Sequence, residues 1–435
     1  MYIVKALGQY ASRGEYCPVM GIPELRSHIA THYSKRDNRI ITPEDVIIGP
    51  GSKELLYLIQ LACQDSTSFT VGMYKYIFSC IYIFICIVYF ILYVLILLYR
   101  VVIYIHTYEL LYISVYITKY IFFLSLYIYI DPSWVTYPAH MTMLNKKHTF
   151  IKTTFEEDWK VNKNNLVASG FDLESDTNSM LILNTPNNPT GLAYTEEELS
   201  ELAGVFKTTK TIVISDEIYE HLQYNNNFKS LAKKLSSQCI ISSGFSKSCG
   251  IGGWRIGYAI FPPELSHIRR AVCSLASETF SCVSTPMQYA ACELKEYLIK
   301  SRKILHAIGT YCTTLLNKAN IRTIAPDGGF YVYPDFEYYI TKFNNNTNNI
   351  HNSGDMTTAI LEQTGVALLP SKEFGTDDGY RARLCFIDFN GDIAMSNCSI
   401  NTDTESELNE EWLRMYCPNV IEGVETLGKW CLELK

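Results

Sequence analysis

A lysine and an arginine in one glycine-rich stretch are the residues of this chain best suited to chemistry. Lys247 follows the short apolar run 239–241 in a turn rich in serine and glycine, and Arg255 stands eight residues later in Gly-Gly-Trp-Arg-Ile-Gly-Tyr. A lysine amine becomes a nucleophile where its surroundings lower its pKa, and it can then form an imine with a carbonyl group. The planar fork of an arginine can hold a phosphate through paired hydrogen bonds. The stretch therefore indicates a reactive amine beside an anion site.

The same stretch resembles a family signature. Ser246-Lys247, followed by Gly-Trp-Arg-Ile-Gly-Tyr at 253–258, is similar to the cofactor-lysine motif of class I/II pyridoxal-phosphate aminotransferases, the aspartate-aminotransferase-like group of fold type I. Four further family segments occur in the family's order. The resemblance implies a transaminase that moves an amino group from an L-amino acid to a 2-oxo acid. Lys247 would hold pyridoxal 5'-phosphate as an internal aldimine and move the substrate proton, while Ser246 and Arg255 would bind the cofactor phosphate.

A second anion site is expected near the N-terminus. The apolar run 46–48 leads into Gly-Pro-Gly-Ser-Lys and then into a helical pattern over 54–64. Free backbone N–H groups and the dipole at the start of a helix attract an anion. In register with the family, Gly51, Ser52 and Lys53 are expected to hold the cofactor phosphate.

The elements that position these motifs alternate between strands and helices. Continuous apolar runs at 180–183, 211–214 and 239–241 are typical of buried parallel strands, and a capping box opens a helix over 196–206. This alternation predicts an α/β fold with a doubly wound, mostly parallel sheet. A long helical pattern from Pro262 to about Leu316 is expected to lead into a smaller C-terminal α/β domain.

Four residues beside the predicted strands acquire roles from the resemblance. Asn188, in Asn-Asn-Pro-Thr-Gly, would donate a hydrogen bond to the phenolate oxygen of the cofactor and also contact the substrate. Asp216 would pair with the protonated pyridine nitrogen, and Tyr219 would support the phenolate beside Asn188. Trp134 would stack on the pyridine ring. An acid at the carboxyl end of such a strand faces the ligand crevice of an open α/β sheet, which agrees with the role given to Asp216.

Two further residues complete the expected site. The run Tyr-Arg-Ala-Arg-Leu-Cys-Phe at 380–386 resembles the family's carboxylate-binding strand, and its register favours Arg383 over Arg381 as the partner of the substrate α-carboxylate. Tyr16 corresponds to the tyrosine that reaches the cofactor phosphate of the neighbouring subunit, so the resemblance implies a homodimer. Family members carry a longer N-terminal segment before this tyrosine, and we expect that arm to lie upstream or to be lacking.

The composition limits the class of protein and its partners. A chain of 435 residues can form a large domain, expected at 1–305, and a smaller one at 306–435. Its net charge of −7 does not suggest nucleic acid or an anionic membrane as a partner. The 14 cysteines form no C-x-x-C pair, which indicates a reducing compartment and neither disulfides nor a metal site. A cytoplasmic location is expected, or an organelle if a transit peptide has been lost.

Residues 73–130 interrupt the resemblance. They consist mainly of Tyr, Ile, Phe, Leu and Val, and the uncharged run 77–99 is long enough to cross a bilayer. A membrane span there would divide the catalytic domain, however, and AT-rich non-coding DNA yields this composition when translated. The codons for residues 72–74 can contain GTATGT, a common intron start, and those for residues 130–131 can contain the AG that ends an intron. Removal of about 59 codons then restores Val-Asp-Pro in phase, so a retained intron is the favoured interpretation.

Alternative functions share the same residues. A carbon–sulfur lyase or an enzyme resembling aminocyclopropane-carboxylate synthase would use the same lysine, aspartate and arginine. In a different class, the polypeptide as translated would be a non-functional or membrane-associated product because of the insert and the short N-terminus.

Overall fold

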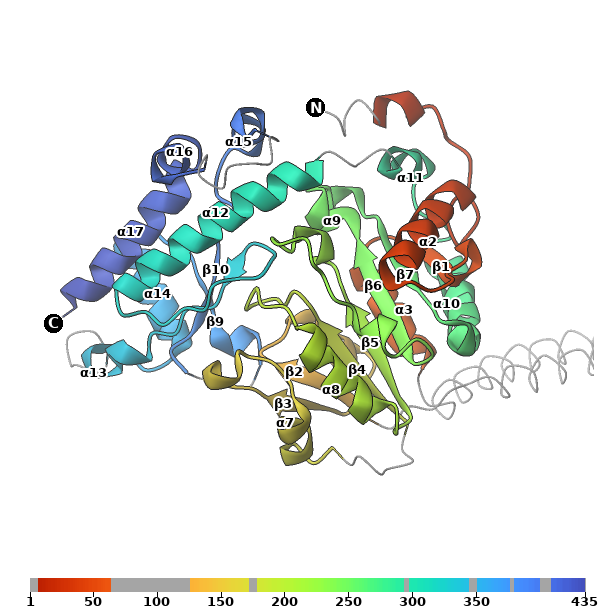
Figure 1. The fold of residues 1–435 in the computed structure, drawn as a ribbon, viewed down its shortest axis with the longest axis horizontal. Coiled ribbons are helices and arrows are strands. Elements are labelled where there is room, and N and C mark those ends of the chain that lie inside the picture. Colours follow the sequence, from red (N-terminus) through yellow and green to blue (C-terminus); the bar gives the residue numbers. More distant parts are fainter. Residues whose placement is uncertain are drawn as a thin grey trace, which may run out of the picture.

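A mixed seven-stranded sheet forms the centre of the molecule in the computed structural model (Figure 1). The structure describes residues 7–63, 126–171, 178–292, 297–343, 350–375, 379–399 and 408–434. The strand order is β1-β7-β6-β5-β4-β2-β3. The strands are β1 (Val46–Gly49), β2 (Leu126–Asp131), β3 (His148–Lys152), β4 (Ser179–Asn184), β5 (Thr211–Asp216), β6 (Cys239–Gly244) and β7 (Gly257–Ile260).

Five neighbouring strands, β3, β2, β4, β5 and β6, run parallel, whereas β7 is antiparallel to both β6 and β1. The parallel register pairs Asn184 with Asp216 and Asp216 with Ser242. Polar residues at the carboxyl ends of three strands are thereby brought to one edge of the sheet. The predicted doubly wound, mostly parallel sheet is confirmed.

Helices cover both faces of this sheet (Figure 1). Side chains alternate along each strand, so Leu181 and Leu183 of β4 join one apolar cluster and Met180 and Ile182 join the other. The first cluster includes side chains of α2 (Pro23–Asp37), α7 (Lys163–Ala168) and α8 (Glu196–Phe206). The second includes side chains of α3 (Ser52–Ala62), α6 (Thr136–Met143) and α10 (Ser266–Thr279).

The start of α8 follows the predicted capping box. The Thr195 hydroxyl accepts a hydrogen bond from the Glu198 backbone N–H at 3.2 Å, and the Glu198 carboxylate accepts one from the Thr195 N–H at 2.7 Å. Two donors at the helix start are thus satisfied reciprocally.

Strand β2 comes from the last residues of the segment that we assigned to the insert. Tyr127 and Tyr129 face the α3 side of the sheet, and Ile128 and Ile130 face the other side. Residues 126–130 are therefore part of the sheet, and the structural boundary does not coincide with the expected insert end at Ile130. The remainder of the insert, with the apolar run 77–99, lies outside the described residues. Within the described residues, no helix is both long and apolar enough to cross a bilayer.

A second apolar core surrounds a three-stranded sheet in the C-terminal part of the chain. Its strands, in the order β8-β10-β9, are β8 (Tyr331–Val332), β9 (Leu369–Pro370) and β10 (Ala382–Cys385). The accompanying helices are α12 (Tyr297–Lys318), α13 (Ile340–Phe343), α14 (Ser353–Thr364), α15 (Gly391–Asn397), α16 (Glu410–Tyr416) and α17 (Pro418–Glu433). Side chains of α12 join this core from Ile304 onward. The division into domains at 305/306 stays a prediction.

The helical pattern expected from Pro262 to about Leu316 is divided among three α-helices within the described residues. The chain forms α10, then α11 (Thr285–Ala291), and then α12. Between α10 and α11, Ser281 adopts a positive φ of 61°, and α11 begins with a proline in its first turn. The positive φ ends the first helix, and the proline favours a new helix start because it cannot occupy a helix interior, although the apolar spacing on either side resembles one continuous pattern.

Candidate active site

A cavity of about 460 Å³ lies beside the carboxyl ends of β4, β5 and β6. It is lined by Ser52, Lys53, Trp134, Tyr137, Asn184, Asn188, Asp216, Ile218, Tyr219, Ser246, Lys247, Gly252, Arg255, Tyr331 and Arg383. Four of these side chains are lysines or arginines, and one is an aspartate. The cavity therefore suits a ligand that carries several negative charges.

Lys247 lies on the short helix α9 (Phe245–Ser248), which follows β6 directly. Its Nζ atom is 5.6 Å from the centroid of the Phe330 ring. Burial lowers the pKa of the Lys247 amine, and the nearby cations Arg383, Lys53 and Arg255 lower it further. A larger fraction of the amine is thus unprotonated at a given pH, which is the condition for a nucleophile or a base.

Asp216 ends β5 inside the cavity wall and is 1% exposed. Its Oδ2 atom accepts a hydrogen bond from the Tyr137 hydroxyl at 2.7 Å, and its Oδ1 atom accepts a longer one from the Ile218 backbone N–H at 3.3 Å. Burial raises the pKa of Asp216 to about 6, although both hydrogen bonds act in the opposite direction. A cation beside this carboxylate would relieve the cost of burying its charge.

A chain of side-chain hydrogen bonds connects β4 with β10 across the cavity. The Asn184 amide donates to the Asp216 carbonyl at 2.9 Å, and its Oδ1 atom accepts from the Asn188 backbone N–H at 2.7 Å. Arg383 Nη1 donates to Asn188 Oδ1 at 3.0 Å. Among the described residues, buried Arg383 Nε has no hydrogen-bond partner. A half-buried guanidinium with an unused donor is suited to an anionic ligand.

Backbone geometry shapes a small cradle at the start of α3. Gly51 precedes the helix with a φ of 91°, and among the described residues no side chain caps that helix. Arg255 Nη2 donates to the Pro50 carbonyl at 2.9 Å. A Cβ atom on Gly257 would lie 2.3 Å from the Ser52 nitrogen, so only glycine leaves room there. The cradle combines free helix N–H groups with a guanidinium, which is the donor set that a phosphate requires.

The cavity collects most of the residues singled out from the sequence. Those that line it are Ser52, Lys53, Trp134, Asn188, Asp216, Tyr219, Ser246, Lys247, Arg255 and Arg383. Gly51 adjoins the cavity through Ser52. Tyr16 is outside the lining and is 89% exposed, and Arg381 instead pairs with Asp335 and Glu337.

Sequence reasoning missed Tyr137, Asn184 and Tyr331. Asn184 directly follows the predicted strand 180–183, and its polar amide at a strand end was an available signal. Tyr137 lies in an aromatic segment whose pattern does not show which ring faces Asp216. The Tyr331 hydroxyl accepts from Tyr219 at 3.4 Å, a contact between two separate apolar segments that nothing in their spacing indicates.

The residues present fit pyridoxal phosphate. The cradle at Ser52 and Arg255 offers donors for a phosphate, Asp216 offers a buried carboxylate for a ring nitrogen, and Lys247 offers an amine for a carbonyl. Trp134 and Tyr219 provide aromatic surface at the same cavity.

Comparison with known proteins gives a consistent result. The family model described as aminotransferase class I and II matches residues 125–389. An aspartate aminotransferase from Bacillus sp. (strain YM-2) is 26% identical over 378 residues, covering 84% of this chain and 78% of the relative. A probable aspartate/prephenate aminotransferase from Rhizobium leguminosarum bv. phaseoli is 27% identical over 398 residues, covering 87% and 82%.

Solved structures share the fold. The aspartate aminotransferase from Thermus thermophilus with maleate superposes with a TM-score of 0.70 at 21% identity, covering 98% of this chain and 87% of the other. The aromatic aminotransferase from Pyrococcus horikoshii OT3 has a TM-score of 0.69 at 20% identity, covering 98% and 91%.

Proposed function

The chain belongs to the aminotransferase class I and II family, and from that premise we propose that it binds pyridoxal 5'-phosphate at Lys247 and uses aspartate as its amino donor. It is an aminotransferase, and its substrates are an amino acid and a 2-oxo acid. The observation that carries the proposal is one cavity that holds a half-buried lysine of lowered pKa, a buried aspartate and an arginine whose Nε atom has no hydrogen-bond partner among the described residues.

The cofactor would be held at three points. Ser52, Ser246 and Arg255 would bind its phosphate, Asp216 would pair with the ring nitrogen, and Asn188 and Tyr219 would contact the phenolate side. When bound, pyridoxal phosphate supplies an electron sink that stabilises negative charge at the substrate Cα. Trp134 would lie against the ring face, where stacking adds to binding.

Lys247 is the group that moves the proton. With the amino acid substrate in the cavity, the Nζ atom of Lys247 would accept the proton from the substrate Cα. Its lowered pKa favours the neutral amine that this step requires. When the Lys247 amine later gives this proton back, it would act as a general acid.

Asp216 and Tyr137 set the charge at the far end of the cavity. The Tyr137 hydroxyl fixes Oδ2 of the carboxylate at 2.7 Å and leaves the acid oriented toward the cavity. A protonated ring nitrogen would pair with this carboxylate and keep it ionised. Tyr137 is thus a positioning residue, because it acts through Asp216.

Two cations suit a dicarboxylic substrate. Arg383 is expected to bind the α-carboxylate, and its guanidinium already lies 4.5 Å from the Tyr331 ring centroid and 5.1 Å from that of Phe374. The Lys53 Nζ atom lies 4.9 Å from the Trp134 ring centroid, at the same cavity. We assign Lys53 to the side-chain carboxylate of aspartate, whereas the sequence alone placed it at the phosphate. The names of the relatives and the maleate in the Thermus structure support a dicarboxylate.

One experiment separates the two roles of Lys53. In a Lys53→Met variant, kcat/KM for aspartate should fall at least tenfold, while kcat/KM for alanine and the affinity for pyridoxal phosphate change little. Equal losses for both amino acids, together with weaker cofactor binding, would return Lys53 to the phosphate site and leave aspartate without its proposed partner.

The cofactor assignment is tested on the protein without turnover. Borohydride reduction of the protein with pyridoxal phosphate should fix one cofactor per chain on the peptide that contains Lys247, and a Lys247→Ala variant should lose this label. A label on any other lysine would refute the assignment. Product analysis with aspartate and 2-oxoglutarate would separately reveal a lyase, since a lyase releases ammonia or a cleaved side chain and no new amino acid.

A homodimer is part of the proposal, because Tyr16 is 89% exposed and lies outside the cavity of its own chain. Mixed dimers of Tyr16→Phe and Lys247→Ala chains should regain one intact site if Tyr16 serves the neighbouring subunit. If the mixture is no more active than the Tyr16→Phe protein alone, this role is wrong.

A further inference from the structure

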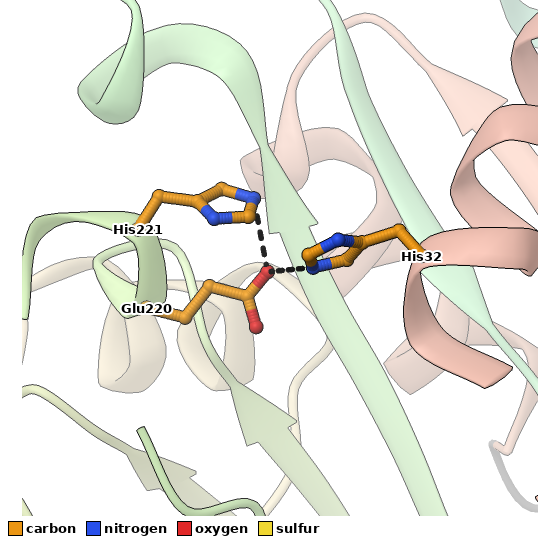
Figure 2. Close-up of side chains that lie close together, drawn as sticks. All are labelled: His32, Glu220 and His221. Carbon is orange, nitrogen blue, oxygen red and sulfur yellow. Dashed lines mark ion pairs between the residues drawn. The ribbon is translucent and has the colours of Figure 1, made fainter. Parts of the chain in front are cut away.

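Two histidines and one glutamate converge on the side of the large sheet that carries α2. His32 belongs to α2, while Glu220 and His221 belong to the short helix η3 (Glu220–Leu222) that follows β5 and Tyr219. Figure 2 shows both imidazole rings directed at the same carboxylate. Within the described residues, these three form the one group of His, Cys, Asp and Glu side chains with metal-ligand spacing.

The distances fit a four-coordinate metal. The three ligand atoms lie within 4.8 Å of one another. Nε2 of His221 is 3.2 Å from Glu220 Oε1, and Nε2 of His32 is 3.9 Å from the same oxygen. Bonds of about 2.0–2.1 Å in a tetrahedral zinc site place neighbouring ligand atoms about 3.4 Å apart. A shift of His32 by about half an ångström would bring its Nε2 atom to this distance from Glu220 Oε1, and its side chain, 48% exposed, has room to move toward His221 as well.

We propose that His32, Glu220 and His221 bind a divalent metal of the zinc class through Nε2, Oε1 and Nε2. The half-exposed face of His32 leaves the fourth position to water. Two imidazoles and a carboxylate form a ligand set that zinc accepts. The metal would join α2 to the segment that continues from Tyr219, and so link the N-terminal part of the chain to the floor of the cavity.

Neighbouring charges permit a cation at this point. Arg36 contacts Glu220, but it also donates to both oxygens of Asp37, at 2.8 and 2.9 Å, and to Glu217 at 2.7 Å. Arg36 therefore keeps two carboxylate partners when a metal binds Glu220. The Tyr33 hydroxyl donates to Glu220 Oε1 at 2.6 Å and orients the carboxylate, as outer hydrogen bonds do for metal ligands.

A simpler arrangement makes a different prediction. Two protonated imidazoles could share the Glu220 carboxylate as ion pairs without any metal. A third arrangement uses His28, which lies four residues before His32 on the same exposed side of α2. Histidines spaced i and i+4 on a helix can bind a metal by themselves. The three arrangements require different residues, and so substitutions can separate them.

The test is a titration of the chelator-treated, full-length protein with Zn²⁺ alone, followed by calorimetry. We expect one tight site per chain, with affinity at least tenfold lower in His32→Ala and in His221→Ala and unchanged in the matched control His28→Ala. Co²⁺ serves as a spectroscopic probe, because a tetrahedral site of nitrogen and oxygen ligands gives visible absorption without the strong near-ultraviolet band of thiolate ligands. That visible absorption should disappear in His221→Ala.

Three outcomes would overturn the proposal. Loss of binding in His28→Ala with none in His221→Ala would show a histidine pair on the surface of α2. A thiolate band with Co²⁺ would place the metal on cysteine. No saturable binding to the unsubstituted chain would leave the three side chains as ion pairs. Folding of each variant is checked by circular dichroism and by its thermal unfolding.

Discussion

The Asp216→Asn substitution should reduce the loss of folding stability that the cofactor-free protein undergoes as the pH rises. The carboxylate is buried at the end of β5, and burial raises its pKa to about 6. In the unfolded chain the same group has a pKa of about 3.9. The folded state therefore binds a proton more tightly than the unfolded state, and stability falls as pH rises from about 4 through 6.

The size of this effect follows from the two pKa values. A difference of about two pKa units corresponds to about 3 kcal/mol of stability that is lost once the pH is well above 6. Between pH 5 and pH 8, about 1.4 kcal/mol of this loss remains to be seen, because at pH 5 the unfolded state is already ionised and the folded state is still mostly protonated. The amide of the Asp216→Asn variant does not titrate, so that variant would lack this dependence.

Chemical denaturation of the cofactor-free protein at pH 5 and pH 8 provides the assay. The free energy of unfolding of Asp216→Asn should decline by about 1.4 kcal/mol less than that of the unsubstituted protein over this interval. Any cost of the amide in the hydrogen bonds to Tyr137 and Ile218 is the same at both pH values and cancels in the difference. Tyr137→Phe should act in the opposite direction, since it removes a hydrogen bond that lowers the pKa of Asp216. Parallel pH dependence in all three proteins would refute the reasoning.

Three further substitutions or deletions test other parts of the structure. Arg383→Ala should lower kcat/KM for the amino acid by about ten- to a hundredfold through loss of a charged hydrogen bond, while Arg381→Ala should leave KM unchanged; equal effects in steady-state assays would contradict this assignment. Gly257→Ala should weaken pyridoxal-phosphate binding at least tenfold in a spectroscopic titration. The added Cβ atom would lie only 2.3 Å from the Ser52 backbone nitrogen, so the cradle would have to shift. Unchanged affinity would show that the cradle does not bind the phosphate. A chain without residues 72–130 should fold and be labelled at its cofactor lysine, and sequencing of the mature transcript should show the shortened form; a main transcript that retains the whole stretch would exclude the intron.

Several parts of the fold could be predicted because local patterns determine them. The apolar runs 180–183 and 211–214 lie fully buried inside β4 and β5, and the Thr195–Glu198 capping box starts α8 where its pattern indicates. Lys247 and Asp216 could be found because motif residues directly follow such strands. In each case the signal and its structural cause lie within a few neighbouring residues.

Features that depend on contacts between distant segments could not be predicted. The hydrogen bond between Tyr137 and Asp216 joins residues 79 positions apart, and that between Arg383 and Asn188 joins residues 195 apart. The cluster of His32 with Glu220 depends on the packing of α2 against the sheet. The spacing of the cysteines does not indicate it, because the cluster contains none.

Strand β2 alternates tyrosine with isoleucine along its length. Its two faces are filled by Tyr127 and Tyr129 on one side and Ile128 and Ile130 on the other. In a chain that joins Val71 to Asp131, the sequence Thr-Ser-Phe-Thr-Val of residues 67–71 directly precedes Asp131. Counted back from Asp131, its valine and phenylalanine then take the sequence positions of Ile130 and Ile128.

The two forms of the chain would differ at Gln60, which is fully buried. The Tyr129 hydroxyl donates to Gln60 Oε1 at 2.9 Å, and the Tyr127 hydroxyl donates to its carbonyl at 3.3 Å. Serine and threonine at these positions are too short to reach as far. A spliced message would therefore encode a chain without the two tyrosine hydroxyls that contact Gln60.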